Sequence, residues 1–133
     1  MNVEVTGVAI PRLSRREIAT FTTRVLRALR EKRDISIAFV DDESMKALNK
    51  RFRKKNKTTD VLTFPSDDSY ASDIIISVEQ AKRQAADEKH SLATEIRYLI
   101  LHGVIHSLGH DHETDDGEMN ALELKTRAAV GLE

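Results

Sequence analysis

Four of the chain's five histidines fall within one stretch of eleven residues, HGVIHSLGHDH at 102–112. His102 and His106 are four residues apart, and four residues advance an α-helix by ~400°. Their side chains therefore project from the same side of a helix, about one turn apart, as two nitrogen ligands of one metal ion do. The chain contains no cysteine, so a metal must be held by His, Asp or Glu. We expect one transition-metal ion per chain, with zinc as the best match to such ligands.

The third ligand is chosen by helix geometry. On a continuous helix His110 would lie ~12 Å along the axis from His102, whereas zinc lies only ~2.0–2.1 Å from each ligand nitrogen. Gly109 stands where a left-handed residue commonly ends a helix and lets the chain turn back. We therefore predict His112 as the third metal ligand and His110 as a neighbour of the site or a substrate contact.

A single histidine on a helix is more often a structural residue than a ligand, and we interpret the isolated His90 in that way. Three histidines with a helix-breaking glycine, on an otherwise apolar segment, favour a metal site instead. Three protein ligands leave one position for water, which is typical of a catalytic site. Such a metal acidifies water and polarises a phosphoryl or carbonyl oxygen, so the pattern indicates a hydrolase. Copper and nickel also suit three imidazoles.

The spacing H-x-x-x-H-x-x-G-x-x-H is also that of the metzincin peptidases. In those enzymes the residue after the first histidine is a glutamate that acts as the general base. Here that residue is Gly103, which can neither accept nor donate a proton. The substitution argues against peptidase chemistry.

The elements that must position these residues fit one domain spanning 1–133, with 40% hydrophobic and 32% charged residues. A capping box, Ser14 with Glu17, opens the first helix, and Asp41 or Asp42 caps the second. Hydrophobic periodicity predicts four strands and four further helices: strands at 2–6, 35–40, 61–64 and 73–78, and helices at 43–52, 79–88 (polar and surface-exposed), 92–108 (buried) and 116–129. We predict an α/β (α+β) fold, a small mixed four-stranded sheet covered by about five helices, with a zincin-like metal helix.

The net charge of −1 hides an uneven distribution, because six of the eight residues in KRFRKKNK at 50–57 are basic. Such a stretch suits a phosphate-bearing partner, although a charge run can also be only a solvated face. The chain opens without a secretory signal pattern and has no apolar run of the ~20 residues that cross a bilayer. We expect a cytoplasmic protein without a membrane partner.

Three segments occur in a recognisable order: LNKRFRKKNKTTDVLTFP at 48–65, SDIIIS at 72–77 and the histidine segment at 102–112. Together they resemble the YbeY endoribonuclease family. Its members carry a Tyr/Phe-Arg-x-Lys-Asp segment leading to T-D-V-L-S-F-P, then G-D-I-x-I-S, then H-G-x-x-H-x-x-G-x-D-H. The chain departs from this pattern at four positions, which affects loop shape rather than the metal site: Asn56 for Asp, Thr58 for Pro, Thr63 for Ser and Ser72 for Gly.

The resemblance implies a zinc-dependent endoribonuclease that prefers single strands. It would act in ribosomal RNA processing, at the 3′ end of small-subunit RNA, and in ribosome quality control. The implied partners are ribosomal RNA, ribosomal particles and ribosome-associated proteins, and no DNA is expected. His102, His106 and His112 match the family's metal ligands, Arg53 its functional arginine and Lys55 the accompanying lysine.

The chemistry of Arg53 agrees with this role, because a guanidinium forks onto phosphate oxygens and stabilises charge in the transition state. We expect Arg53 to be catalytic and, with Lys55, to bind substrate. The attacking group is either water activated at the metal or the RNA 2′-OH, and Asp111 is a candidate proton acceptor. Asp60 and Asp73 flank strands, where they either orient a histidine or cap the strand end.

With four Phe, two Tyr and no Trp, stacking platforms for bases are scarce and we expect weak sequence preference. Two rival functions stay open. One is a non-catalytic, zinc-stabilised ribosome-associated assembly protein. The other is a metal-dependent hydrolase of another substrate.

Overall fold

The computed structural model describes residues 2–65, 71–108 and 117–132. In these residues the chain forms strands and helices in the order β-α-β-α-β-β-α-α-α, as predicted. The strands are β1 (Val3–Gly7), β2 (Asp34–Val40), β3 (Val61–Pro65) and β4 (Ala71–Ser77). The helices are α1 (Arg15–Ala28), α2 (Asp42–Arg53), α3 (Val78–Glu88), α4 (Leu92–Ser107) and α5 (Glu118–Val130).

The four strands form one mixed sheet in the order β1-β2-β4-β3. β1, β2 and β4 are parallel, and β3 pairs antiparallel with β4 at the edge of the sheet. A parallel pair requires a crossover connection, and α1 supplies it between β1 and β2. The prediction of a mixed four-stranded sheet covered by five helices is confirmed.

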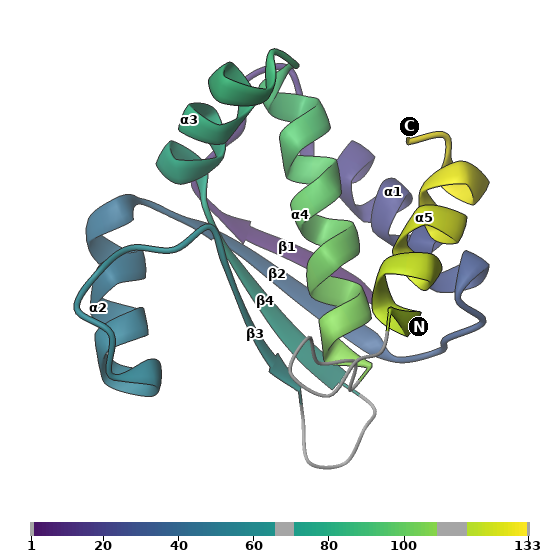
Figure 1. Cartoon of the computed structure of the whole chain (residues 1–133), viewed down its shortest axis with the longest axis horizontal. Coiled ribbons are helices and arrows are strands. Elements are labelled where there is room, and N and C mark those ends of the chain that lie inside the picture. The colour runs from purple at the N-terminus through teal and green to yellow at the C-terminus, as the bar shows by residue number, and fades with distance from the viewer. Residues whose placement is uncertain (1, 66–70, 109–116, 133) are drawn as a thin grey trace.

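The main core lies on one face of the sheet. Alternate residues of β2, Ile35, Ile37 and Phe39, are buried there, because successive side chains of a strand point to opposite faces. Helices α1, α3, α4 and α5 contribute buried residues to the same core. Helix α2 lies against the opposite face of the sheet from α4 and α5 (Figure 1).

Helix α4 is the central element of this core. Ser91 caps its N-terminus by accepting a hydrogen bond from the Thr94 backbone N–H. Apolar residues cover most of its circumference, as predicted, and seven of them are buried: Ile96, Leu99, Ile100, Leu101, Val104, Ile105 and, without a side chain, Gly103. The helix therefore has little freedom to shift, which fixes the direction of any side chain that it carries toward solvent.

The predicted N-terminal caps of the first two helices are confirmed. Ser14 Oγ accepts from the Glu17 N–H at 3.0 Å while Glu17 Oε1 accepts from the Ser14 N–H at 3.2 Å, and Asp41 is the cap of α2. The prediction for 79–88 was wrong in part, because Ala81 and Ala85 are buried. Two alanines among polar residues give only a weak apolar stripe, so the sequence does not show that this side of the helix packs against the rest of the protein. Among the described residues, no helix combines the length and hydropathy needed to span a membrane.

Candidate metal and RNA site

His102 and His106 lie side by side on α4, as the sequence predicts. Their ring centroids are 4.5 Å apart with the ring planes at 66°. Both residues are half-buried, on a helix whose other side chains are mostly in the core. Two imidazoles at this spacing can direct one nitrogen each toward a common ion.

A carboxylate that the sequence did not reveal stands behind this pair. Glu123 of α5 places Oε1 3.6 Å from Nδ1 of His102, and its side chain is only 15% exposed. A carboxylate beside one ring nitrogen favours a proton on that nitrogen, so that Nε2 is the nitrogen that would bind a metal. Arg127, one turn further along α5, lies 3.9 Å from the same Oε1 and helps to hold the carboxylate in place.

A second contact fixes the C-terminal end of α4. Arg33, which precedes β2, donates a hydrogen bond from Nη1 to the carbonyl oxygen of Ser107 at 2.8 Å and another to Ser72 Oγ at 3.1 Å. Ser107 follows His106 directly, so this arginine ties the end of α4 to β4. Ser72, which replaces the glycine of the family pattern, thus has a role in this chain as a hydrogen-bond acceptor.

The remaining candidates of the histidine segment, Gly109, His110, Asp111 and His112, lie outside the described residues. Within the part of the chain that the structure describes, no three His, Asp or Glu side chains gather as metal ligands. The described part of the donor set, two imidazoles with a carboxylate behind one of them, fits zinc. His112 as third ligand stays a prediction.

Gly103, which stands where the metzincins carry their general base, also allows close packing of α4 on the sheet. A Cβ atom at this position would lie 2.9 Å from Cγ2 of the buried Ile74 side chain. The close approach lets α4 rest directly on β4. A glutamate, as in the metzincins, has no room at this position of the helix, so the structure agrees with the exclusion of a peptidase base.

Helix α2, which carries the basic residues, is anchored through Asp42. Its Oδ1 accepts hydrogen bonds from Ser77 Oγ at 2.8 Å and Thr58 Oγ1 at 3.2 Å, and its Oδ2 lies 2.7 Å from Nη2 of Arg83. Burial acts to raise the pKa of this carboxyl, but the hydrogen bonds from Ser77 and Arg83 outweigh burial and hold the pKa below its ordinary value. Thr58, a departure from the family pattern, takes part in this anchor.

Arg53 is the last residue of α2 and is exposed, and Lys55 is exposed in the loop that follows. Lys54 between them has a left-handed conformation, with φ 58°, that ends the helix. The buried Asn49 donates from Nδ2 to the carbonyl oxygen of Lys57 at 2.8 Å, which folds the basic loop back onto α2. The basic residues are thus exposed to solvent on a loop whose backbone is held in place by Asn49.

The structure brings Arg53 and the pair His102 and His106 toward the same end of the molecule. The C-terminal ends of α2 and α4 both lie at the lower side of Figure 1, where β3 ends, with the sheet edge between them.

The contacts of Asp60 and Asp73 that the structure describes are those of strand residues, and a role in orienting a histidine stays a hypothesis. Asp60 Oδ1 accepts from the Val61 N–H at 2.8 Å, as a strand-end residue does. Asp73 lies within β4 and pairs with Phe64 on β3. Its neighbours Ser72 and Ile74 are buried while Asp73 is exposed, so its side chain is on the face of the sheet away from α4.

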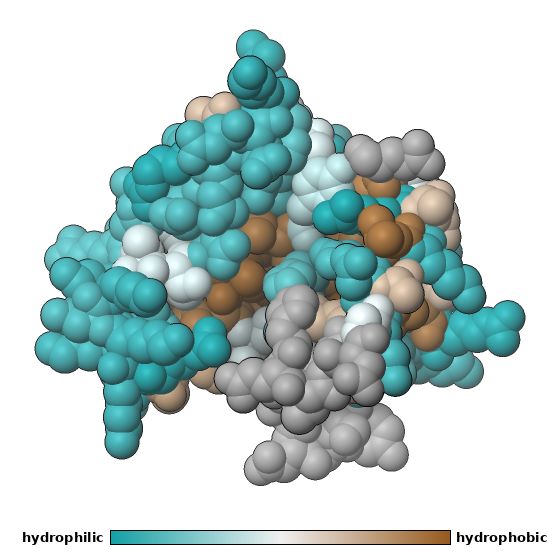
Figure 2. Space-filling view, in the orientation of Figure 1, coloured by the Kyte–Doolittle hydropathy of each residue, from teal (hydrophilic) through white to brown (hydrophobic). Residues whose placement is uncertain are grey.

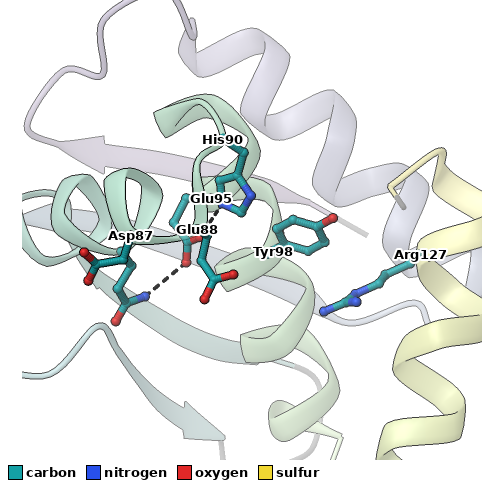
Figure 3. Close-up of a pocket in the computed structure, with 7 residues that line it drawn as sticks. Asp87, Glu88, His90, Glu95, Tyr98 and Arg127 are labelled. Atoms are coloured by element: carbon teal, nitrogen blue, oxygen red, sulfur yellow. Dashed lines mark hydrogen bonds and ion pairs between the residues drawn. The ribbon is translucent and has the colours of Figure 1, made fainter.

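A polar cavity of about 450 Å³ is lined by residues of α3, α4 and α5, among them Glu95, Tyr98 and Arg127 (Figure 3). His90 Nε2 lies 2.6 Å from Oε1 of the buried Glu95, and Gln84 Nε2 donates to Glu95 Oε2 at 3.0 Å. The guanidinium of Arg127 stands 4.6 Å from the ring centroid of Tyr98 on the same wall. These contacts join α3, α4 and α5 and agree with the structural interpretation of His90.

Comparisons with known proteins agree with these features. The sequence profile of the family described as Endoribonuclease YbeY matches residues 8–131. A protein named Endoribonuclease YbeY from Koribacter versatilis is 44% identical over 121 residues, covering 90% of this chain and 80% of the relative. A second protein of that name, from Nautilia profundicola, is 49% identical over 94 residues, covering 68% of each chain.

A solution structure of a protein from Thermotoga maritima has the same fold, with a TM-score of 0.69 at 23% identity, over 96% of this chain and 88% of that one. The profile match runs from residue 8 to residue 131, over every element described above except β1. This range includes the positions of both histidines of α4 and the basic end of α2. The chain belongs to the YbeY endoribonuclease family.

Proposed function

We propose that this protein is a metal-dependent endoribonuclease that cleaves single-stranded RNA and acts in ribosomal RNA processing. The observation that supports this most strongly is the pair His102 and His106, 4.5 Å apart on a rigid buried helix with Glu123 behind it. Family membership and the exposed basic end of α2 support RNA as the substrate. Processing of the small-subunit RNA 3′ end and ribosome quality control are proposed from the family alone.

His102, His106 and, by prediction, His112 would hold one zinc ion. When bound, the metal supplies Lewis acidity toward a phosphoryl oxygen and acidifies water. Glu123, beside Nδ1 of His102, would favour the proton on that nitrogen so that Nε2 binds the metal. Arg33 hydrogen-bonds both the C-terminal end of α4 and β4, and thereby limits the movement of His106 relative to the sheet.

Arg53 binds a phosphate of the strand with its guanidinium and stabilises charge that develops there. Lys55 and the neighbouring basic residues bind flanking phosphates without reading sequence. We propose ribosomal particles or ribosome-associated proteins as the partners that choose the cleavage site, and the cytoplasm as the compartment. No role for DNA or a membrane is proposed.

The deciding assay offers purified protein three substrates, each with and without chelator: single-stranded RNA, an RNA analogue without 2′-OH groups, and an unfolded protein. Chelator-sensitive cleavage of RNA supports the proposal, and loss of cleavage with the analogue identifies the 2′-OH as the attacking group. Chelator-sensitive proteolysis with intact RNA contradicts it. No turnover of RNA by metal-loaded protein, alone or with ribosomal particles, would indicate the non-catalytic assembly protein instead.

A further inference from the structure

A groove lies between α2 and the face of the sheet opposite the main core. Leu48 and Phe52 line it from α2, and Ala38, Phe64, Asp73 and Ile75 line it from the strands. Its volume is about 450 Å³, within the range of sites that hold small molecules. Figure 2 shows apolar surface in the gap beside the hydrophilic surface of α2. We call this cavity the α2–sheet groove.

Phe52 is unusual because its side chain is 53% exposed although it faces an apolar groove. Its ring meets that of Phe64 edge to face, with centroids 5.2 Å apart and planes at 68°. The guanidinium of Arg51 lies 5.2 Å from the centroid of the Phe52 ring. Two of the chain's four phenylalanines thus form a pair with one ring partly open to a ligand.

The charges around the groove select the kind of occupant. Four basic residues occupy the end of α2 next to Phe52, and all are exposed: Lys50, Arg51, Arg53 and Lys54. Such a rim attracts a polyanion, while the apolar walls accept a flat ring. A single strand of RNA carries both features, phosphates and unstacked bases, at adjacent positions of one chain.

We propose that the α2–sheet groove binds one unpaired nucleobase of the RNA, stacked on Phe52 and bordered by Phe64, while the basic end of α2 binds the flanking phosphates. This inference rests on the proposed function and adds a base-binding site to it. It also revises the expectation of scarce stacking platforms, since one is built beside Arg53.

Asp73 gives the groove a preference among bases. Its carboxylate lines the groove from β4, and a carboxylate accepts hydrogen bonds from an exocyclic amino group such as N4 of cytosine. Adenine also carries an amino group, whereas uracil presents a carbonyl oxygen that the carboxylate repels. The site therefore favours cytosine and adenine over uracil.

The test uses the fact that the chain has no tryptophan. The variant Phe52→Trp places a single indole in the groove, and a base stacked on it quenches its fluorescence. Zinc-loaded protein is titrated with oligomers of cytidine, adenosine and uridine whose 2′-OH groups are methylated to prevent cleavage. The length of the oligomers is measured after the titration to show that they are intact. We expect quenching by the cytidine and adenosine oligomers at concentrations several-fold below those needed for uridine.

Affinities of Phe52→Ala and Phe52→Leu are measured by anisotropy with the same labelled oligomers. Both should bind cytidine oligomers about tenfold more weakly, the size of one lost base–aromatic stack, at unchanged zinc content. Leu124→Ala is the matched control, because Leu124 of α5 is also 53% exposed and should bind as the wild type does. Asp73→Asn should reduce the preference for cytidine over uridine.

Parallel cleavage of single-stranded RNA separates the inference from the proposed function. If the wild type cleaves RNA with chelator sensitivity but Phe52→Trp is not quenched and Phe52→Ala binds normally, the base site is wrong and the groove is left to a protein partner. If the wild type neither binds nor cleaves RNA, the proposed function fails and the base site fails with it.

Discussion

Oε1 of Glu123 lies 3.6 Å from Nδ1 of His102, across the interface between α5 and α4. The last helix of the fold therefore contacts the histidine pair of α4 as well as the core. In the proposed metal site, this contact would favour the proton on Nδ1 of His102 and leave metal binding to Nε2. It also makes the position of α5 relevant to metal affinity.

Replacing Glu123 should weaken metal binding without unfolding the protein. Glu123→Ala removes the partner of His102, and loss of such a carboxylate typically costs 10–100-fold in metal affinity. Zinc affinity is measured by competition with a coloured chelator. Glu118→Ala, in the exposed first turn of the same helix, is the control and should bind zinc as the wild type does. Equal affinity of both variants would remove Glu123 from the site.

Replacing Arg53 should slow RNA cleavage and leave the fold and the metal intact. Arg53 is exposed at the end of α2, so its loss removes charge stabilisation rather than packing, and loss of one such contact costs about 10²–10³-fold in rate. Arg53→Lys should recover little, because an ammonium cannot fork onto two oxygens. Lys46→Ala, exposed on the same helix, should cleave normally. Wild-type rates in both Arg53 variants would reduce Arg53 to part of the basic surface.

Much of this fold could be predicted because its signals are local. The Ser14–Glu17 capping box and the pairing of His102 with His106 depend on residues three or four positions apart. Glu123 is far from His102 in the sequence, and nothing in its own segment distinguishes it from other surface glutamates.

The same limit applies to the α2–sheet groove. In the sequence, Phe52 is one position of the apolar stripe of an amphipathic helix. Only the packing of α2 on the sheet shows that its ring is half-exposed beside Phe64. The helical histidines could be predicted from spacing, whereas contacts between elements depend on tertiary packing.

Gly103→Ala should destabilise the protein even though alanine is the better helix former. The added Cβ would meet Ile74 Cγ2 at 2.9 Å, and overpacking a core costs about 1–3 kcal/mol, which exceeds the gain of ~1 kcal/mol in helix propensity. Urea unfolding should show the loss. Ala47→Gly, at an exposed position in the middle of α2, reports propensity alone. A more stable Gly103→Ala variant would contradict the close packing of α4 on β4.

The anchor of α2 should weaken in acid. The pKa of Asp42 is lowered in the folded protein, so its contribution to stability is fully present above the unfolded pKa of ~3.9 and is lost as the pH falls through the lower folded pKa. Asp42→Asn should therefore cost about 1–3 kcal/mol at pH 7 and less at about pH 3. Unfolding free energies at several pH values test this, with Asp87→Asn, an exposed residue of α3, as the control. A constant difference at all pH values would contradict a role for the Asp42 charge.

The most direct test of the account is a zinc titration of RNA cleavage. Protein stripped of metal is mixed with increasing zinc, and the initial rate of cleavage of a single-stranded RNA is measured at each ratio. We predict no cleavage without zinc, a rise to a plateau at one equivalent per chain, and no rise with His102→Ala or His106→Ala. Cleavage by metal-free protein at the loaded rate, or full activation of His106→Ala by one equivalent of zinc, would contradict the assignment of these histidines.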